Sequence, residues 1–452
     1  MCYNVEQGRL AELVDAIDSK SVGSNTVWVQ VPHCPPHHMR IAIFTDCYLD
    51  LTGGIVANIN IEKSELELRG HEVYIFSSAY PRTAKEKAAL AKQYIFPVPS
   101  CKIFGRGAAP IARRPGIIEK WLLKNHPEIR DFDVFYVHYE AGCSIAGLRL
   151  ARQLNIPSVQ FMHGREDSAE ELLIPFGLRT FVATMLNWFH SWYLPHPVHV
   201  HRDDYLATTV ARAKMWSLMV NHANFADLVI TPSKQFTKKL SYYGVGRPIV
   251  SLHHGMSGEF LNSKAKSKSL KSGETLEMIW HSRVSGEKRT LPFLGALNIL
   301  HHYYNKDNYH LSVFGSGPDI IAAKNYAKLH RLHVTFYGRT SFNEIWQKLQ
   351  TSHLDILASY NYDTFGMVLI EAAAAKVPAL IVDPDLAEIL PDDSYAMPVS
   401  PAPALMAERL AEVLDHPGQI AAMSKNLAKL PEDLNVVRKI DSLEQIFASL
   451  TE

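Results

Sequence analysis

Two carboxylates eight positions apart, Asp363 and Glu371, flank a Thr-Phe-Gly turn and an Ala-rich stretch with the pattern of a helix. A helix of 3.6 residues per turn places Glu371 near the end of its second turn, with Asp363 just outside the helix start. The first backbone N–H groups of a helix lack intrahelical partners and favour an anion. The spacing predicts a phosphate at the helix start, one acid on sugar hydroxyls and the other on a ribose diol. A core helix with incidental acids at its ends is the alternative.

Two cations, Arg283 and Lys288, lie five residues apart in a loop that follows an apolar strand pattern over residues 276–280. Arg offers a bidentate fork to a phosphate, and Lys offers a compact point charge. A leaving nucleoside diphosphate gains negative charge as its bond to the sugar breaks, so fixed cations stabilise that transition state selectively. Taken alone, the loop could equally hold surface cations that pair with Glu287.

A histidine and a glycine pair also lie next to predicted strands. His163 ends the strand at residues 158–162, and such an end lies at the ligand-binding edge of an α/β sheet. Gly53 and Gly54 follow the first strand, where the lack of side chains lets the backbone approach a phosphate or an acceptor. A lone histidine is more often structural, and a glycine pair is a weak signal.

The elements that must position these residues are alternating short apolar strands and helices, which predict doubly wound parallel sheets. Strands are expected at residues 40–45, 71–76, 134–138, 158–162 and 228–231, and then at 276–280, 311–314, 334–337, 354–359 and 379–382.

The chain length of 452 residues favours two or three domains. Residues 1–38 contain a proline-rich run that cannot continue regular structure, and we expect a poorly ordered leader there. The two α/β series divide into residues 39–255 and 256–432, with a helical segment at 433–452. A basic, Ser-rich loop is expected at residues 262–273.

The composition excludes several classes of protein. Lys+Arg and Asp+Glu both number 46, so the charge balance predicts no nucleic-acid partner. Five scattered cysteines without a Cys-x-x-Cys pair favour a reducing compartment. We find no signal-peptide pattern and no apolar run of about 18 residues, and residues 181–194 are too short and too polar to span a bilayer. A cytoplasmic protein is expected.

The motifs together resemble those of retaining nucleotide-sugar glycosyltransferases of the GT-B fold, glycosyltransferase family 4. Residues 362–378 resemble the Glu-x7-Glu signature of that family, with Asp363 in the first Glu position. The resemblance covers about residues 39–450. It implies two Rossmann-like doubly wound parallel-sheet domains facing each other across a cleft, with the segment 433–452 crossing back to the first domain.

The resemblance also implies roles for individual residues. Arg283 and Lys288 would neutralise the leaving diphosphate, and His163 would position the donor sugar. The turn Gly315-Ser316-Gly317-Pro318 would be mostly structural. The expected catalytic residues are His163, Arg283, Lys288 and Asp363, and the expected donor-binding residues are Gly53, Gly54, Gly338, Arg339, Thr364, Phe365, Gly366, Met367 and Glu371.

Asp363 departs from the family signature because its side chain is one methylene shorter than Glu. The change could shift donor preference, lower the rate or mark a degenerate site. UDP-glucose is the favoured donor, and a GDP-mannose-dependent mannosyltransferase is an alternative. A catalytically silent protein that binds or stabilises a partner is a second alternative, and a sugar phosphorylase with a lysine-bound pyridoxal cofactor is a third.

The acceptor is expected to be a lipid or a glycan. Residues 103–124 and 176–194 combine basic and aromatic side chains, which suits an anionic membrane surface. They could equally form a core or a subunit contact. The resemblance includes bacterial diacylglycerol glucosyltransferases, which use lipid acceptors, so a place at the inner face of the membrane is expected if this chain does the same.

No metal and no cofactor are expected, since the donor chemistry of the fold needs no bound metal and the nucleotide sugar is a cosubstrate. Two histidine clusters nevertheless have metal-like spacing. One is formed by His33, Cys34, His37 and His38, and the other by His196, His199 and His201.

Overall fold

The structure is a computed structural model that describes residues 38–47, 54–78, 83–101, 111–165, 167, 174–430 and 434–451. The expected leader, residues 1–38, lies outside this range except for His38. The chain forms two compact units: unit 1 runs to Gly255 and resumes at Val436, and unit 2 spans Met256–Asn435. The chain therefore leaves unit 1 and returns to it in its last helix.

Unit 1 is built on a seven-stranded sheet with the order β3-β2-β1-β6-β7-β8-β9, in which every pairing is parallel. Its inner strands are buried on both faces, as expected for apolar runs in a parallel sheet. The strands are β1 (Arg40–Thr45), β2 (Glu72–Ser77), β3 (Ile95–Pro97), β6 (Val134–His138), β7 (Ser158–Phe161), β8 (Leu228–Thr231) and β9 (Ile249–Ser251), with a separate antiparallel pair β4 (Ser100–Cys101) and β5 (Ile111–Ala112). Its helices include α2 (Gly54–Leu68), α3 (Ala84–Ala91), α4 (Pro115–Asn125), α5 (Gly142–Leu154), α7 (Arg179–Ser191), α8 (Val210–Ala223), α9 (Lys234–Tyr242) and α17 (Val436–Thr451).

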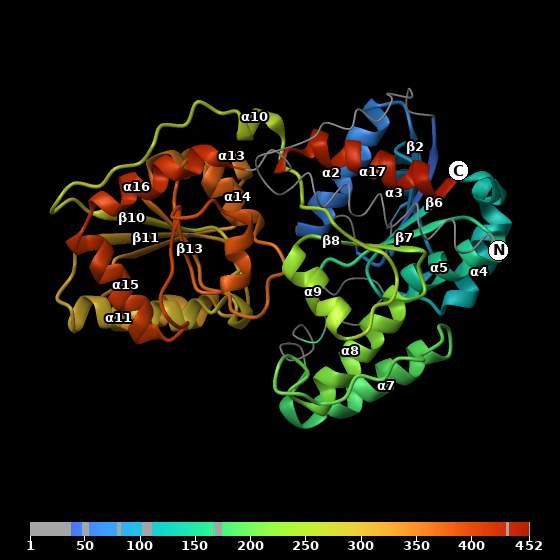
Figure 1. Cartoon of the computed structure of the whole chain (residues 1–452), viewed down its shortest axis with the longest axis horizontal. Helices are drawn as coiled ribbons and strands as arrows, with labels where there is room; N and C mark the ends of the chain where they lie inside the picture. The colour runs from blue at the N-terminus through green and yellow to red at the C-terminus, as the bar shows by residue number, and fades with distance from the viewer. Residues whose placement is uncertain are drawn as a thin grey trace. The chain divides into compact units, whose positions relative to one another are not determined.

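Unit 2 is built on a six-stranded parallel sheet with the order β12-β11-β10-β13-β14-β15. Helices α11 and α15 lie on one face of this sheet, and α13 and α14 lie on the other (Figure 1). The strands are β10 (Leu276–Trp280), β11 (Tyr309–Phe314), β12 (Val334–Gly338), β13 (Leu354–Leu357), β14 (Ala379–Ile381) and β15 (Tyr395–Ala396). The helices are α10 (Gly258–Leu261), α11 (Thr290–His302), α12 (Ile320–Leu329), α13 (Phe342–Thr351), α14 (Met367–Ala374), α15 (Pro403–Asp415) and α16 (Gly418–Asn426).

These two sheets confirm the predicted fold class. The ten predicted strands coincide with β1, β2, β6, β7, β8 and β10 to β14, with ends that differ by at most two residues. Three short strands at or near sheet edges, β3, β9 and β15, were not predicted. They have only two or three residues each, so they carry little hydrophobic pattern.

Helix α17 packs on unit 1 beside α2 (Figure 1). Its apolar face, including Ile440, Leu443 and Phe447, joins the core cluster that contains β1 and β6. Its polar edge is held by Arg69, whose guanidinium lies 2.7 Å from Asp441 Oδ1 and 2.6 Å from Glu444 Oε2. Apolar burial and ion pairing therefore both hold the chain end on unit 1.

We expect Arg69→Ala to lower the free energy of unfolding of unit 1 by about 1–3 kcal/mol, because two carboxylates of α17 lose their charged donor. Denaturant unfolding followed by fluorescence measures the change. Arg130→Ala removes an exposed arginine of the same unit and serves as the control. Equal midpoints for the two variants would show that the ion pairs do not hold α17.

Candidate active site

The acidic signature occupies the connection from β13 to α14 in unit 2. Helix α14 begins at Met367, so Glu371 lies just over one turn into the helix. The prediction that Glu371 lies near the end of the second turn was therefore wrong. The reason is that Thr364, Phe365 and Gly366 form a turn before the helix starts.

Gly366 is the N-cap of α14, and no side chain caps this helix end. A Cβ at Gly366 would lie 2.9 Å from Leu369 Cδ1 and 3.2 Å from Leu357 Cδ2, so only glycine fits the close packing. Phe365 is buried in the core cluster beside α14, so its side chain supports the turn. The first N–H groups of α14 thus lie at a helix start that suits an anion.

Lys288 and Asp363, which were predicted as separate site residues, form an ion pair. Lys288 Nζ lies 2.6 Å from Asp363 Oδ1 and 2.8 Å from Oδ2, and the two side chains are 16% and 13% exposed. Ser359 Oγ donates a further hydrogen bond of 2.5 Å to Asp363 Oδ2. The ion pair between Lys288 and Asp363 therefore joins the loop after β10 to the turn before α14.

Arg283 lies in the same loop, but its side chain is 61% exposed and its Nη1 is 3.3 Å from Glu287 Oε1. This pairing is the alternative that the sequence left open for Arg283. Of the two cations, Lys288 is the one that the structure shows in contact with the turn before α14.

The loop that carries Arg283 is held by the Gly-x-Gly-Pro turn after β11. A Cβ at Gly315 would lie 2.2 Å from the carbonyl oxygen of Ser282, and one at Gly317 would lie 2.2 Å from that of Val284. The N–H of Gly315 also donates to the carbonyl oxygen of Gly338 at 2.7 Å. The glycines are thus structural, as the resemblance implied, and they join the loops after β10, β11 and β12. Arg339, next to Gly338, is exposed.

In unit 1, His163 follows β7 and is buried. Its Nε2 lies 2.7 Å from Nδ1 of His138, which ends the neighbouring strand β6, and its ring stacks on that of Phe161 with centroids 4.1 Å apart. Burial, together with the charge of Lys439, lowers the pKa of His163 well below its usual value. His163 is therefore neutral near pH 7, and it can exchange hydrogen bonds with a ligand without carrying charge.

A buried polar network continues beyond His138. Glu62 Oε2 lies 3.8 Å from His138 Nε2, and Glu62 Oε1 lies 2.5 Å from Nζ of Lys439. The sequence reading missed these three residues. His138 had an available signal, because it ends a predicted strand as His163 does. Glu62 and Lys439 had none, since they meet only through the packing of α17 on α2.

The remaining predicted residues give mixed outcomes. Gly54 begins α2, and a Cβ there would meet no atom within 4 Å, so nothing in the described structure requires glycine. Gly53 lies outside the described residues.

His196 Nε2 lies 2.5 Å from His190 Nδ1, in a chain of histidines that continues to His222. Across the described ranges, no group of three or more His, Cys, Asp or Glu side chains is arranged to hold a metal ion. Of the other cluster, His33, Cys34 and His37 are not described.

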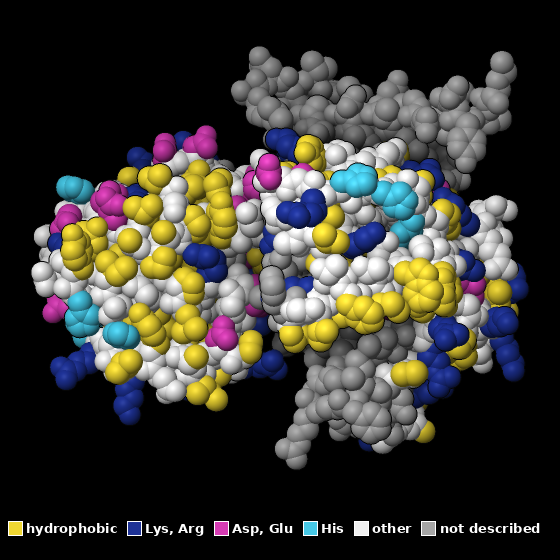
Figure 2. All heavy atoms as spheres, turned by 90° about the horizontal axis from the view of Figure 1, so that it is seen from below, with side chains coloured by type: hydrophobic (Ala, Val, Ile, Leu, Met, Phe, Trp, Pro, Cys, Tyr) yellow, Lys and Arg dark blue, Asp and Glu magenta, His cyan; other side chains and the backbone are white. Residues whose placement is uncertain are grey.

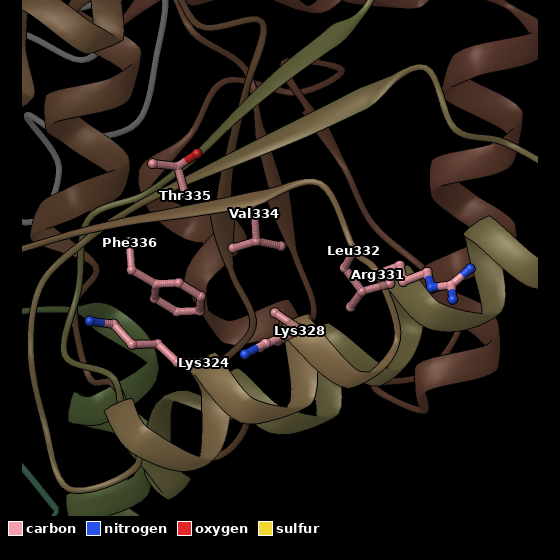
Figure 3. Close-up of a pocket in the computed structure, with 8 residues that line it drawn as sticks. Lys324, Lys328, Arg331, Leu332, Val334, Thr335 and Phe336 are labelled. Atoms are coloured by element: carbon pink, nitrogen blue, oxygen red, sulfur yellow. The ribbon is translucent and has the colours of Figure 1, made fainter.

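A shallow hollow lies elsewhere in unit 2, between α12 and the edge strand β12 (Figure 3). Lys324, Lys328 and Arg331 line it, and Lys324 Nζ lies 6.0 Å from the centre of the Phe336 ring. None of the predicted donor-binding residues is among its lining residues. It is therefore separate from the Lys288–Asp363 pair.

Comparisons with known proteins identify relatives and the fold. The alpha-monoglucosyldiacylglycerol synthase of Acholeplasma laidlawii is 22% identical over 408 residues, covering 86% of this chain and 91% of that protein. The synthase of the same name from Streptococcus pneumoniae (strain ATCC BAA-255 / R6) is 24% identical over 357 residues, covering 76% of this chain and 70% of that protein. A crystal structure of Anabaena HepE in complex with UDP-glucose matches with a TM-score of 0.63 and 16% identity, covering 91% of this chain and 100% of that one. The fold is GT-B.

Two family models match consecutive parts of the chain. The model described as Glycosyltransferase Family 4 matches residues 53–259, and the model described as Glycosyl transferases group 1 matches residues 262–430. The first match lies almost entirely in unit 1, and the second lies in unit 2. The two matches together span most of the chain, which is therefore a hexosyltransferase built from a Glycosyltransferase Family 4 domain and a Glycosyl transferases group 1 domain.

Proposed function

We propose that this enzyme moves a hexose, with retention of configuration, from a nucleotide-diphosphate sugar to a hydroxyl acceptor, with UDP-glucose as the favoured donor. The observation that carries the proposal is the Lys288–Asp363 pair beside the uncapped start of α14. The lysine cation and the helix start suit the negative charge of a diphosphate, and the carboxylate suits the hydroxyls of a sugar. The relatives named as monoglucosyldiacylglycerol synthases support a glucosyl donor.

In this proposal Lys288 neutralises the negative charge that the diphosphate gains as the glycosidic C–O bond breaks. Arg283, which is exposed on the same loop, exchanges Glu287 for a phosphate oxygen. The acceptor oxygen attacks the face that the diphosphate leaves, and a departing phosphate oxygen takes the acceptor's proton. Asp363 holds sugar hydroxyls, and Glu371 holds the ribose diol. Because Lys288, Arg283 and the helix start supply the positive charge, we propose no metal and no cofactor.

Radiolabelled UDP- and GDP-sugars, each offered with lipid and glycan acceptors, test this function. Transfer or slow hydrolysis of UDP-glucose is the expected result. Turnover of GDP-mannose alone would favour the mannosyltransferase alternative, and nucleotide binding without any turnover would favour a silent protein. A phosphorylase would instead show the absorbance of a pyridoxal cofactor above the aromatic band.

We expect Lys288→Ala to lower kcat by about two orders of magnitude or more, since a cation that stabilises the leaving group is lost. Arg283→Ala should lower kcat to a similar extent. Lys324→Ala, in the separate hollow on α12, is the matched control and should keep the parent rate. Parent rates in both Arg283→Ala and Lys288→Ala would refute the leaving-group assignment.

We further propose that the acceptor is a lipid and that α7 contacts an anionic membrane from the cytoplasmic side. Helix α7 packs one face on α8 and leaves apolar side chains exposed on the other. Apolar and basic side chains are mixed on the surface of unit 1 in Figure 2, a combination that suits an anionic bilayer surface. Within the described ranges, no helix is long and apolar enough to cross a bilayer. The exposed apolar residues of α7 and its flanks are Leu178, Phe181, Met185, Leu186, Trp188 and Trp192.

The double variant Trp188→Ser/Trp192→Ser should weaken co-sedimentation with vesicles that contain anionic lipid by about tenfold or more, because two exposed aromatic anchors are lost. Tyr303→Ser removes an aromatic of unit 2 that is more exposed than either tryptophan, and this variant should bind vesicles as the parent does. Binding that is indifferent to anionic lipid, or unchanged in the double variant, would refute the proposed role of α7.

A further inference from the structure

A further acid–base contact in unit 2 is formed by His281. His281 follows the last residue of β10, and its side chain is 1% exposed. Its Nδ1 lies 3.2 Å from Glu371 Oε2, and its Nε2 lies 3.2 Å from Asp355 Oδ1. One imidazole thus bridges an acid inside β13 and the acid that was predicted to bind the donor.

The two carboxylates around His281 determine whether its imidazole is neutral or protonated. Asp355 has a fully buried side chain, which is costly for a carboxylate unless a cation faces it. A neutral imidazole would present a lone pair to one of the two carboxylates, whereas an imidazolium carries positive charge towards both. Burial alone lowers the pKa of His281, but Asp355 and Glu371 outweigh it and raise that pKa to about 10. His281 is therefore a cation at neutral pH.

Glu371 differs from Asp355 in that its side chain is 19% exposed, so a ligand can reach it. A carboxylate on a helix surface can adopt several rotamers. Fixing one of them when a ligand binds costs binding free energy. The contact with His281 selects one rotamer before any ligand arrives. The positive charge also reduces repulsion between Glu371 and an anionic nucleotide bound at the start of α14.

We propose that His281 is a positioning residue for the donor: anchored on Asp355, it holds the Glu371 carboxylate in the orientation that accepts a vicinal diol of the nucleotide's ribose. The inference rests on the proposed function, because it assigns Glu371 to the donor. The competing explanation is that His281 only neutralises buried Asp355 and has no effect on ligands.

The double variant His281→Gln/Asp355→Asn separates the two explanations. It removes both buried charges together, so it avoids the penalty of leaving Asp355 unpaired, while Glu371 still loses its cation. Positioning predicts that KM for the nucleotide sugar and Kd for UDP rise about tenfold or more, because Glu371 loses the cation that faces it, while kcat changes much less. His353→Gln makes the same exchange just before β13 and should leave both constants unchanged.

The single variant Asp355→Asn gives a second readout that a purely structural role would not produce. The charged groups that face His281 are Asp355 from β13 and Glu371 from α14, so removing Asp355 lowers the pKa of His281 towards its ordinary value. UDP affinity in this variant should match the parent at pH 6 and fall as the pH rises to 9, because the cationic form is lost. The parent, in which Asp355 and Glu371 raise the pKa of His281 to about 10, should show no such fall once the titration of UDP's own terminal phosphate, which all the proteins share, is subtracted.

Calorimetric titration with UDP at pH 6, 7.5 and 9 measures all four proteins, and thermal melts check that each variant folds. A folded double variant with parent affinity overturns the inference and leaves the proposed function intact, provided that the parent binds UDP. A flat pH profile in Asp355→Asn also overturns it, even if the double variant fails to fold. A parent that binds neither UDP nor GDP overturns both the inference and the proposed function.

Discussion

The arrangement of unit 2 depends on the ion pair between Lys288 and Asp363. The side chains of Lys288 and Asp363 are both mostly buried, and a buried charge without a partner is costly. Removing one partner of such a pair destabilises the folded state by about 3–5 kcal/mol. That requirement draws the loop after β10 onto the turn before α14. It also leaves a cation beside a helix start that has no side-chain cap, so the same contact that satisfies the fold prepares a place for an anion.

The parallel sheet makes this arrangement possible, since loops after neighbouring parallel strands meet at one edge. In unit 2 the glycines after β11 let three such loops pack backbone to backbone, with Gly315 and Gly317 against the carbonyl groups of Ser282 and Val284. His281 follows β10 and contacts Asp355 in β13 and Glu371 on α14. Buried charge and close backbone contact therefore position the candidate donor residues together.

Unit 1 uses buried charge in a related way. Lys439 arrives on α17, from the far end of the chain, and pairs with Glu62 below His138 and His163. Its charge helps to keep the pKa of His163 low, so that this histidine stays neutral. The last helix is thus linked electrostatically to a predicted site residue, in addition to its apolar contacts with unit 1.

The sequence alone predicted the fold class, ten of the strands and a set of candidate site residues, because hydrophobic periodicity and strand-end motifs are local signals. Only the tertiary structure decided which charges meet. It paired Lys288 with Asp363, left Arg283 exposed, started α14 at Met367, and placed His281 between Asp355 and Glu371. Sequence reasoning could not find the contacts of Lys288 and His281, because their partners are 74 to 90 residues away along the chain and the contacts depend on burial, which no local pattern records. The pairing of Arg283 with Glu287, four residues away, was one of the alternatives that the sequence left open.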